Sequence, residues 1–332
     1  MIDASVIVPT RNRAPVLRAC LQSLCAQTAP KERFEVIVVD NGSTDDTEAV
    51  VREFTTVLPL RLLHEGEPGL HVGRHAGARA ARADVLMFCD DDIVAAPGWV
   101  EAVVRRFEDP RVALVGGNNL PGWQGEPPAW LAHAWSLPAG HGRALAALSV
   151  LDFGARTFDI DPAWVWGCNF NVRRAALDVA GGFHPDGVPP ERLRWRGDGE
   201  MHVGAVVRER GWRTVFDAAA SVEHRVDAGR MTAEYFRRRA FAQGISDSYT
   251  RIRRRGGLGA DAGRWLVPLR EFRQSLRDRR ALAAAAGAPA VLQWHQIRAE
   301  ARRAHAEGVA FHRAEVRRDP ALLAWVLKED YR

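Results

Sequence analysis

The sequence predicts an α/β protein whose mostly parallel sheet is flanked by helices and followed by a helical C-terminal extension. Over residues 5–92, short apolar runs rich in β-branched residues alternate with helix-like segments, which is the pattern of strand–helix–strand units in a parallel sheet. After Met231, apolar side chains recur at helical spacing instead. A chain of 332 residues is long enough for one large α/β domain and an extension. We therefore expect a domain at residues 1–226 and a helical extension at residues 227–332.

The expected elements of the first 92 residues follow one another in a regular order. Apolar runs predict strands at residues 5–9, 34–40, 60–63 and 85–89. Helical spacing of apolar residues predicts helices at residues 13–26, 45–54 and 72–83. Ser43 or Thr44 is placed to cap the second of these helices.

The elements expected after residue 92 are less regular. Val112–Val115 predicts a further strand. The Gly-, Trp- and Pro-rich stretch 116–142 is more typical of a long active-site loop than of regular structure. The remaining expected elements are a strand-like segment at 163–172, a helix from Arg173, a helix at 200–210, short strands at 214–216 and 221–224, and helices after 231 that break near 256–257 and 287–289.

Composition and charge restrict the class of protein. Apolar residues make up 47% and charged residues 26% of the chain, as in an ordinary globular protein. Residues 226–332 contain 22 basic and 12 acidic residues, whereas residues 1–225 contain 24 basic and 29 acidic ones. A basic extension favours contact with an anionic partner such as lipid headgroups or a polyprenyl phosphate, although a solvated helical surface explains the same charges. No nucleic-acid-binding module is recognisable, so a nucleic-acid partner is not expected.

Cysteine usage and hydropathy indicate the compartment. The four cysteines form no metal-binding pattern and fit a reducing environment. No secretory signal pattern opens the sequence, and the low-charge stretch Ala281–Trp294 is too short to span a bilayer. We expect a cytoplasmic protein, with peripheral contact at the inner face of the membrane through the basic extension as a further expectation.

Polar clusters follow three of the expected strands, at Thr10–Arg13, Asp40–Ser43 and Asp90–Asp92. In open α/β sheets, ligands bind at the carboxyl ends of the strands. Three adjacent carboxylates at the end of a buried strand repel one another unless a cation or another partner neutralises them. A divalent ion with oxygen ligands could do so and could also bridge two phosphates. The structural alternative is an acidic surface turn. An acid at the position of Asp40 can accept hydrogen bonds from a ribose or a base edge, or can serve a helix-capping loop.

Four segments resemble, in order and spacing, the successive motifs of the family 2 glycosyltransferases. They are VIVPTRNR at 6–13, VIVVDNGSTD at 36–45, GLHVGRHAG at 69–77 and FCDDD at 88–92. The similarity extends over roughly residues 4–226, which it identifies as a catalytic domain. The resemblance implies the GT-A fold and inverting transfer of a sugar from a nucleotide-diphosphate donor, a UDP-sugar first of all. The implied acceptor is a hydroxyl of a glycan, glycolipid or small molecule, in polysaccharide, glycolipid or glycoconjugate synthesis.

The resemblance also implies roles for individual residues on the donor side. Asp40 would contact uracil and Arg74 would face the donor phosphates. The full set implied for nucleotide-sugar binding is Pro9, Thr10, Arg11, Arg13, Asp40, Asn41, Ser43, Gly69, Arg74, Asp90 and Asp91. Asp92, Asp90 and His224 would bind Mn²⁺ or Mg²⁺, with Asp92 as the main direct ligand. One departure is His75, where family members often have asparagine.

The catalytic base is expected at the start of the helix at 200–210. Inverting transfer needs a group that takes the proton of the acceptor hydroxyl, and family members commonly have an acidic pair near this point. Counting back from the helix-closing Gly211 places Glu200 at the base position, with Asp198 as the alternative. Both acids could instead simply cap the helix. The residues that resemble the acceptor-side wall of the family are Trp164, Trp166, Gly167 and Asn169.

Two other functions fit the same sheet and acids. A nucleotidyltransferase is disfavoured because no glycine-rich, lysine-bearing phosphate loop follows the first strand. A catalytically silent carbohydrate-binding protein is the alternative of a different class, since the fold alone does not fix a function.

Overall fold

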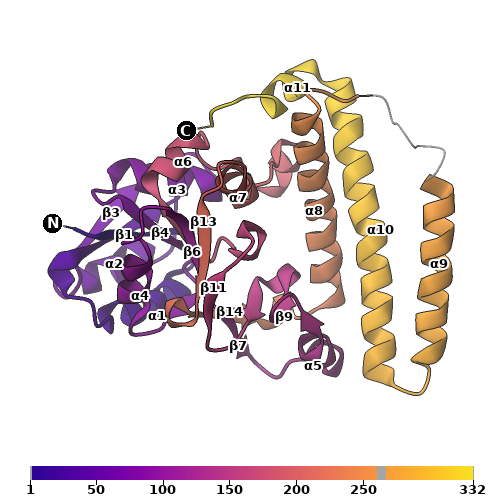
Figure 1. The fold of residues 1–332 in the computed structure, drawn as a ribbon, viewed down its shortest axis with the longest axis horizontal. Coiled ribbons are helices and arrows are strands. Elements are labelled where there is room, and N and C mark those ends of the chain that lie inside the picture. Colours follow the sequence, from indigo (N-terminus) through magenta and orange to yellow (C-terminus); the bar gives the residue numbers. More distant parts are fainter. Residues whose placement is uncertain (1, 260–266, 332) are drawn as a thin grey trace.

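The computed structural model describes residues 2–259 and 267–331. Two sheets with flanking helices form one part of the molecule, and three long C-terminal helices lie side by side next to it (Figure 1). The predicted α/β class with a helical C-terminal region is confirmed. The division at residue 226 stays a prediction.

The larger sheet has eight strands in the order β11-β13-β6-β12-β4-β1-β2-β3. Its strands are β1 (Ala4–Thr10), β2 (Phe34–Asp40), β3 (Leu60–His64), β4 (Val85–Cys89), β6 (Val112–Gly116), β11 (Thr157–Asp159), β12 (Asn169–Arg173) and β13 (Arg213–Asp217). The strands β4, β1, β2 and β3 run parallel, as the alternating pattern predicts. Thr10 at the end of β1 pairs with Asp40 at the end of β2, so the polar residues that follow these strands lie at one edge.

The smaller sheet has six strands in the order β5-β14-β7-β10-β9-β8. They are β5 (Ile93–Ala95), β7 (Asn119–Gln124), β8 (Pro138–Ala139), β9 (Gly142–Leu145), β10 (Val150–Asp152) and β14 (Val222–Asp227). The sequence-based prediction of a long loop at 116–142 is therefore wrong, because this segment contains β7, β8, the start of β9 and the helix α5 (Ala129–Ser136). Its aromatic residues pack against distant helices: Trp130 stacks on Trp294 with ring centroids 6.1 Å apart. Local composition does not reveal such a partner.

The helices around the sheets are α1 (Ala14–Cys25), α2 (Thr47–Phe54), α3 (Leu70–Ala80), α4 (Trp99–Arg106), α6 (Arg174–Val179) and α7 (Glu200–Glu209). The cap predicted for α2 is wrong: the carboxylate of Asp45, not Ser43 or Thr44, accepts a hydrogen bond from the Thr47 N–H at 3.1 Å. The strand expected at 163–172 is shorter than predicted, since only β12 forms there and a 3₁₀ turn occupies Pro162–Trp164.

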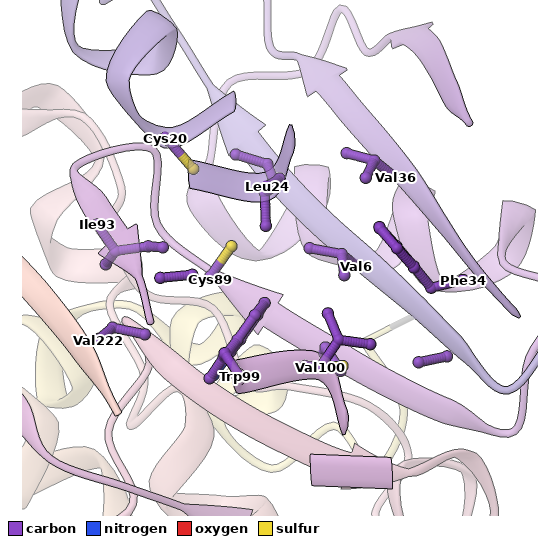
Figure 2. Packing of buried hydrophobic residues seen from close by; sticks show 14 of the residues in the cluster. Val6, Cys20, Leu24, Phe34, Val36, Cys89, Ile93, Trp99, Val100 and Val222 are labelled. Atoms are coloured by element: carbon purple, nitrogen blue, oxygen red, sulfur yellow. The ribbon is translucent and has the colours of Figure 1, made fainter. Parts of the chain in front are cut away.

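One apolar layer between the larger sheet and its helices fixes the strands that carry the polar edge. Val6, Val36 and Cys89 from the sheet pack with Leu24 and Trp99 from the helices, and all five side chains are fully buried (Figure 2). Because β1, β2 and β4 are buried along their whole length, their carboxyl ends are held rigidly relative to one another.

The C-terminal region consists of α8 (Ala233–Arg254), α9 (Val267–Ala284), α10 (Pro289–Arg318) and α11 (Pro320–Val326). The helices α8 and α10 meet backbone to backbone at two glycines. A Cβ atom on Gly308 would lie 2.0 Å from the carbonyl oxygen of Phe241, and one on Gly244 would lie 2.1 Å from that of His305. None of the described helices combines the length and apolar composition that a bilayer span requires.

Replacing Gly308 by alanine should lower the free energy of unfolding by about 1–3 kcal/mol, as overpacking of an interface does. Elsewhere in a helix the same change is expected to be stabilising, so the sign of the effect reports the close approach. Urea unfolding of the Gly308→Ala variant gives the measurement. Gly287→Ala is the control, because a Cβ atom there meets no atom within 4 Å. A Gly308→Ala protein as stable as the wild type would show that the two helices are not in backbone contact.

Candidate functional site

A cavity of about 390 Å³ opens at the carboxyl ends of β1, β2 and β4. Eight residues of the predicted donor side line it: Pro9, Thr10, Arg11, Arg13, Asn41, Gly69, Asp90 and Asp91. Leu70 and the segment Gly187–Pro189 complete the lining. Three other predicted residues, Asp40, Ser43 and Arg74, are not among the lining residues.

The residues after β2 build the loops of this cavity. The side-chain amide of Asn41 donates to the carbonyl oxygens of Glu65 and Glu67 at 3.2 and 2.6 Å and accepts from the Gly69 N–H at 2.8 Å. The carboxylate of Asp40 accepts from the Ser43 N–H at 2.8 Å. These contacts hold the turn after β2 against the segment that leads into α3.

The first two aspartates of the acidic cluster have separate basic or hydroxyl partners. Asp90 accepts from Arg74 Nη2 at 2.7 Å. Asp91 accepts from the Thr10 hydroxyl at 2.7 Å and pairs with Arg13 Nη1 at 2.8 Å. Burial raises the pKa of Asp91 to about 7, against the opposing charge of Arg13. The repulsion expected between adjacent carboxylates is thus relieved in part by arginines.

Asp92 lies beside His224, although 132 positions separate them in the chain. The strands β5 and β14 pair so that His224 faces Ile93, and this register places His224 Nε2 3.2 Å from Asp92 Oδ1. Both side chains are almost fully buried. Burial opposes ionisation of Asp92, but His224, Arg13 and Arg230 hold its pKa well below its usual range.

The pair formed by Asp92 and His224 fits a divalent cation. Within the described residues, Asp92 Oδ1 and His224 Nδ1 are buried without a hydrogen-bond partner, and Oδ1 lies 3.2 Å from His224 Nε2. A carboxylate oxygen next to an imidazole nitrogen is a donor set that Mn²⁺ accepts well and Mg²⁺ accepts through the oxygen. The structure thus brings two of the three predicted metal ligands, Asp92 and His224, into contact. The third, Asp90, is bound to Arg74.

Arg230 is a site residue that sequence reasoning missed. Its Nη1 lies 3.2 Å from Asp92 Oδ2, and its Nε donates to the Tyr235 hydroxyl at 3.2 Å. The only sequence signal is its position six residues after His224, where a short turn after the strand could return a basic side chain to the same carboxylate.

Glu200 is the first residue of α7 and is connected to the acidic cluster through Arg74. Glu200 Oε1 accepts from the Gly167 N–H at 3.0 Å, and Oε2 lies 3.9 Å from Arg74 Nη1. The same guanidinium binds Asp90 and is 1% exposed. Burial raises the pKa of Glu200, against the opposing charge of Arg74. Such a carboxylate is a better proton acceptor than an ordinary glutamate.

Asp198 is held differently from Glu200. One of its carboxylate oxygens pairs with His184 Nδ1 at 2.6 Å, and the other accepts from the Thr250 hydroxyl at 2.5 Å. Burial opposes ionisation of Asp198, but these hydrogen bonds hold its pKa below the usual value. Both oxygens are therefore engaged in joining the segment before α7 to α8.

A second cavity has a volume of about 1040 Å³. The predicted acceptor-side residues Trp164 and Trp166 line it together with Glu200 and one face of α8. Gly167 reaches Glu200 through its N–H. Asn169 does not line this cavity; its side chain accepts from the Trp99 indole and donates to the Ala220 carbonyl oxygen, inside the core.

A second set of side chains could also hold a cation. His71, Asp186 and Glu200 offer ligand atoms that lie within 4.8 Å of one another. His71 is buried, and neither ring nitrogen has a hydrogen-bond partner among the described residues. Burial holds the pKa of His71 well below its usual value, so the ring is neutral. Asp186, however, already pairs with Arg196 at 2.6 Å.

Comparisons with known proteins agree with this geometry. Residues 5–159 match the model of glycosyl transferase family 2. Among curated relatives, validoxylamine A glucosyltransferase from Streptomyces hygroscopicus subsp. jinggangensis is 30% identical over 198 residues, which are 55% of this chain and 47% of the relative. Glycosyltransferase AglE from Haloferax volcanii is 39% identical over 116 residues, 34% of this chain and 38% of the relative. The matches thus span less than half the length of these two relatives.

A solved structure shares the fold over nearly the whole chain. The mannosyltransferase PcManGT from Pyrobaculum calidifontis, in complex with GDP-Man and Mn²⁺, superposes with a TM-score of 0.55 at 20% identity, covering 97% of this chain and 85% of that one. This likeness supports the GT-A architecture.

Proposed function

Residues 5–159 belong to family 2 of the glycosyltransferases, and from this premise we propose that the protein transfers a sugar from a nucleotide-diphosphate donor to an acceptor hydroxyl, with inversion and with Mn²⁺ or Mg²⁺ as cofactor. One observation carries the proposal. Arg74 binds Asp90 at the edge of the smaller cavity and lies next to Glu200 at the edge of the larger one. A donor site and a proton acceptor are thus held by one buried guanidinium.

The smaller cavity is proposed to hold the nucleotide diphosphate. Asp40 and Asn41 at the end of β2 would face the nucleoside. Arg11 and Arg13 line this cavity. A guanidinium can exchange a carboxylate partner for a phosphate, because both groups accept two parallel hydrogen bonds from it. Arg13 and Arg230, now bound to the aspartates, are therefore suited to turn towards the diphosphate.

The cofactor is proposed to bind at Asp92 and His224, with Asp90 as a further ligand once Arg74 turns to the donor phosphates. When bound, the cation would balance the charge of the departing diphosphate. The set formed by His71, Asp186 and Glu200 is the weaker candidate, because a cation there would occupy the carboxylate that the reaction needs as a base.

Glu200 is proposed as the base. Its Oε1 is fixed by the Gly167 N–H, which leaves Oε2 to take the proton of the acceptor hydroxyl as that oxygen attacks the anomeric carbon. Asp198, with both oxygens occupied, is proposed to position the start of α7 rather than to take the proton. Trp164 and Trp166 would provide apolar faces for the acceptor sugar.

Nucleotide sugars should stabilise the protein against heat only when Mn²⁺ is present. A specific donor at 100 times its Kd is expected to add about 2.7 kcal/mol to the free energy of unfolding. Thermal shift with UDP-glucose, UDP-glucuronate and GDP-mannose, with Mn²⁺ or with EDTA, gives the measurement. Equal stabilisation in EDTA would remove the metal from the proposal. Release of pyrophosphate from a nucleoside triphosphate would instead indicate a nucleotidyltransferase. Binding of glycans without any nucleotide binding would indicate a carbohydrate-binding protein without catalytic activity.

A further inference from the structure

One face of α8 forms a wall of the larger cavity, which Trp164 and Trp166 also line. Residues Arg239, Gln243, Asp247, Thr250 and Arg254 all line this cavity, and they recur every three or four positions, as one face of a helix does. The middle of this face is fixed next to the proposed base. Thr250 binds Asp198, and Ser246 accepts from Arg196 Nε at 3.0 Å.

Most of the acids that line the larger cavity have an arginine, histidine or hydroxyl partner. Asp186 pairs with Arg196, Asp161 pairs with Arg208, and Asp247 pairs with His305. Asp198 has His184 and Thr250 as partners. In the part of the chain that the structure describes, the lining acids left without an ion pair at normal contact distance are Glu200 and Glu209.

In contrast to these acids, three arginines of α8 that line the cavity have no oppositely charged partner among the described residues. They are Arg239, Arg251 and Arg254. Arg251 and Arg254 are exposed at one end of the wall. Arg239 is partly buried at the other end, two turns before Ser246, and its Nε is fully buried without a hydrogen-bond partner. A buried guanidinium N–H without an acceptor is costly, and no carboxylate among the described residues balances the charge that Arg239 presents at the cavity.

We propose that the acceptor carries an anionic group, a phosphate or a carboxylate, and that Arg239 binds this group while the reacting hydroxyl lies at Glu200. The proposal rests on the proposed function and names the class of its acceptor. Seven residues of helix separate Arg239 from Ser246, which corresponds to about 10 Å. The anion would therefore bind away from the reacting hydroxyl, towards the start of α8. Arg251 and Arg254, at the far end of the face, would add to the attraction of an anionic acceptor from solvent.

The test uses the full chain saturated with UDP and Mn²⁺, so that the donor cavity is filled. The probes are glucose 6-phosphate, glucuronate and glucose, together with farnesyl phosphate and farnesol, and binding is followed by calorimetry. Arg239→Gln removes the charge, and Arg239→Lys keeps it without the planar fork. Arg238→Gln is the matched control, because Arg238 faces Glu234 on the exposed side of α8 and does not line the cavity.

At least one anionic probe should bind about tenfold or more tightly than its neutral counterpart, and Arg239→Gln should remove that difference. The lysine variant should retain part of it, and Arg238→Gln should bind as the wild type does. Preference for glucose 6-phosphate or glucuronate would indicate a free sugar acceptor, and preference for farnesyl phosphate a lipid-linked one.

Three outcomes would overturn the proposal. Equal binding of neutral and anionic probes is the first, and unchanged binding in Arg239→Gln is the second. The third is that the protein binds vesicles containing phosphatidylglycerol and that Arg238→Gln and Arg239→Gln weaken this binding equally. The arginines of α8 would then serve contact with a membrane surface and not binding of the acceptor. These outcomes differ from failure of the proposed function, which would appear as absence of nucleotide binding and can be seen without any acceptor probe.

Discussion

Replacing Glu200 by glutamine is expected to lower kcat for sugar transfer by about 10²- to 10⁴-fold, the range that a general base contributes. Glutamine keeps an oxygen for the Gly167 N–H but cannot take a proton, so the Kd of the nucleotide should change little. Initial rates and nucleotide titrations separate the two quantities. Glu48→Gln, at an exposed ion pair on α2, is the control and should behave as the wild type.

A second prediction concerns the pH dependence of kcat/KM in the wild type and in Glu200→Gln. A base must be ionised to work, and burial raises the pKa of Glu200 above its ordinary value. Wild-type kcat/KM should therefore fall as the pH drops through an apparent pKa higher than the ~4.3 of a free glutamate. The residual activity of Glu200→Gln should lack this limb. If Glu200→Gln keeps the wild-type profile while Asp198→Asn loses it with nucleotide binding intact, Asp198 is the base.

Replacing Asp92 by asparagine is expected to lower the metal-dependent rate by more than about 100-fold, since a bound cation supplies several kcal/mol of charge stabilisation. The Mn²⁺ concentration at half-maximal activity should rise as well. The measurement is a Mn²⁺ titration of the transfer rate, with Asp159→Asn, at an exposed ion pair on β11, as the control.

Asp92 also pairs with Arg13 and Arg230, so the folding of its variant must be checked by urea unfolding. His224→Ala offers an independent test, because it removes a proposed ligand without removing a negative charge. It should shift the Mn²⁺ dependence in the same direction. Full activity of the wild type in EDTA, or an unchanged Mn²⁺ titration in both variants, would place the cation elsewhere or exclude it.

The part of the fold that sequence predicts well is the part governed by local pattern. The strands β1, β2 and β4 are buried runs that end in polar residues, and a parallel sheet brings such ends together whatever the rest of the chain does. The cavity lined by Thr10, Asn41 and Asp90 follows from this rule. Glu200 was predicted at a helix start, and α7 begins there.

The part that sequence predicts poorly depends on distant pairing. Arg230 reaches Asp92 only because β14 pairs with β5, and no local pattern encodes that register. The segment 116–142 forms strands and a helix, and its Trp130 packs against Trp294, which lies 164 positions later in the chain. Asn169 is a further example: it lies three positions after Trp166, which lines the larger cavity, but its side-chain amide is hydrogen-bonded to Trp99 and Ala220 in the core.

If the larger cavity holds the acceptor, the backbone contact between α8 and α10 gives the C-terminal region a role in selectivity. Gly244 and Gly308 allow α8 and α10 to approach closely, which fixes the position of α8 relative to α10. One face of α8 is a wall of the larger cavity. Under the proposed function, acceptor preference would then depend both on the sheets and on the C-terminal helices. Exchanging the C-terminal helices between related enzymes would then replace this wall of the cavity as a whole, provided that the two glycines at the α8–α10 contact are kept.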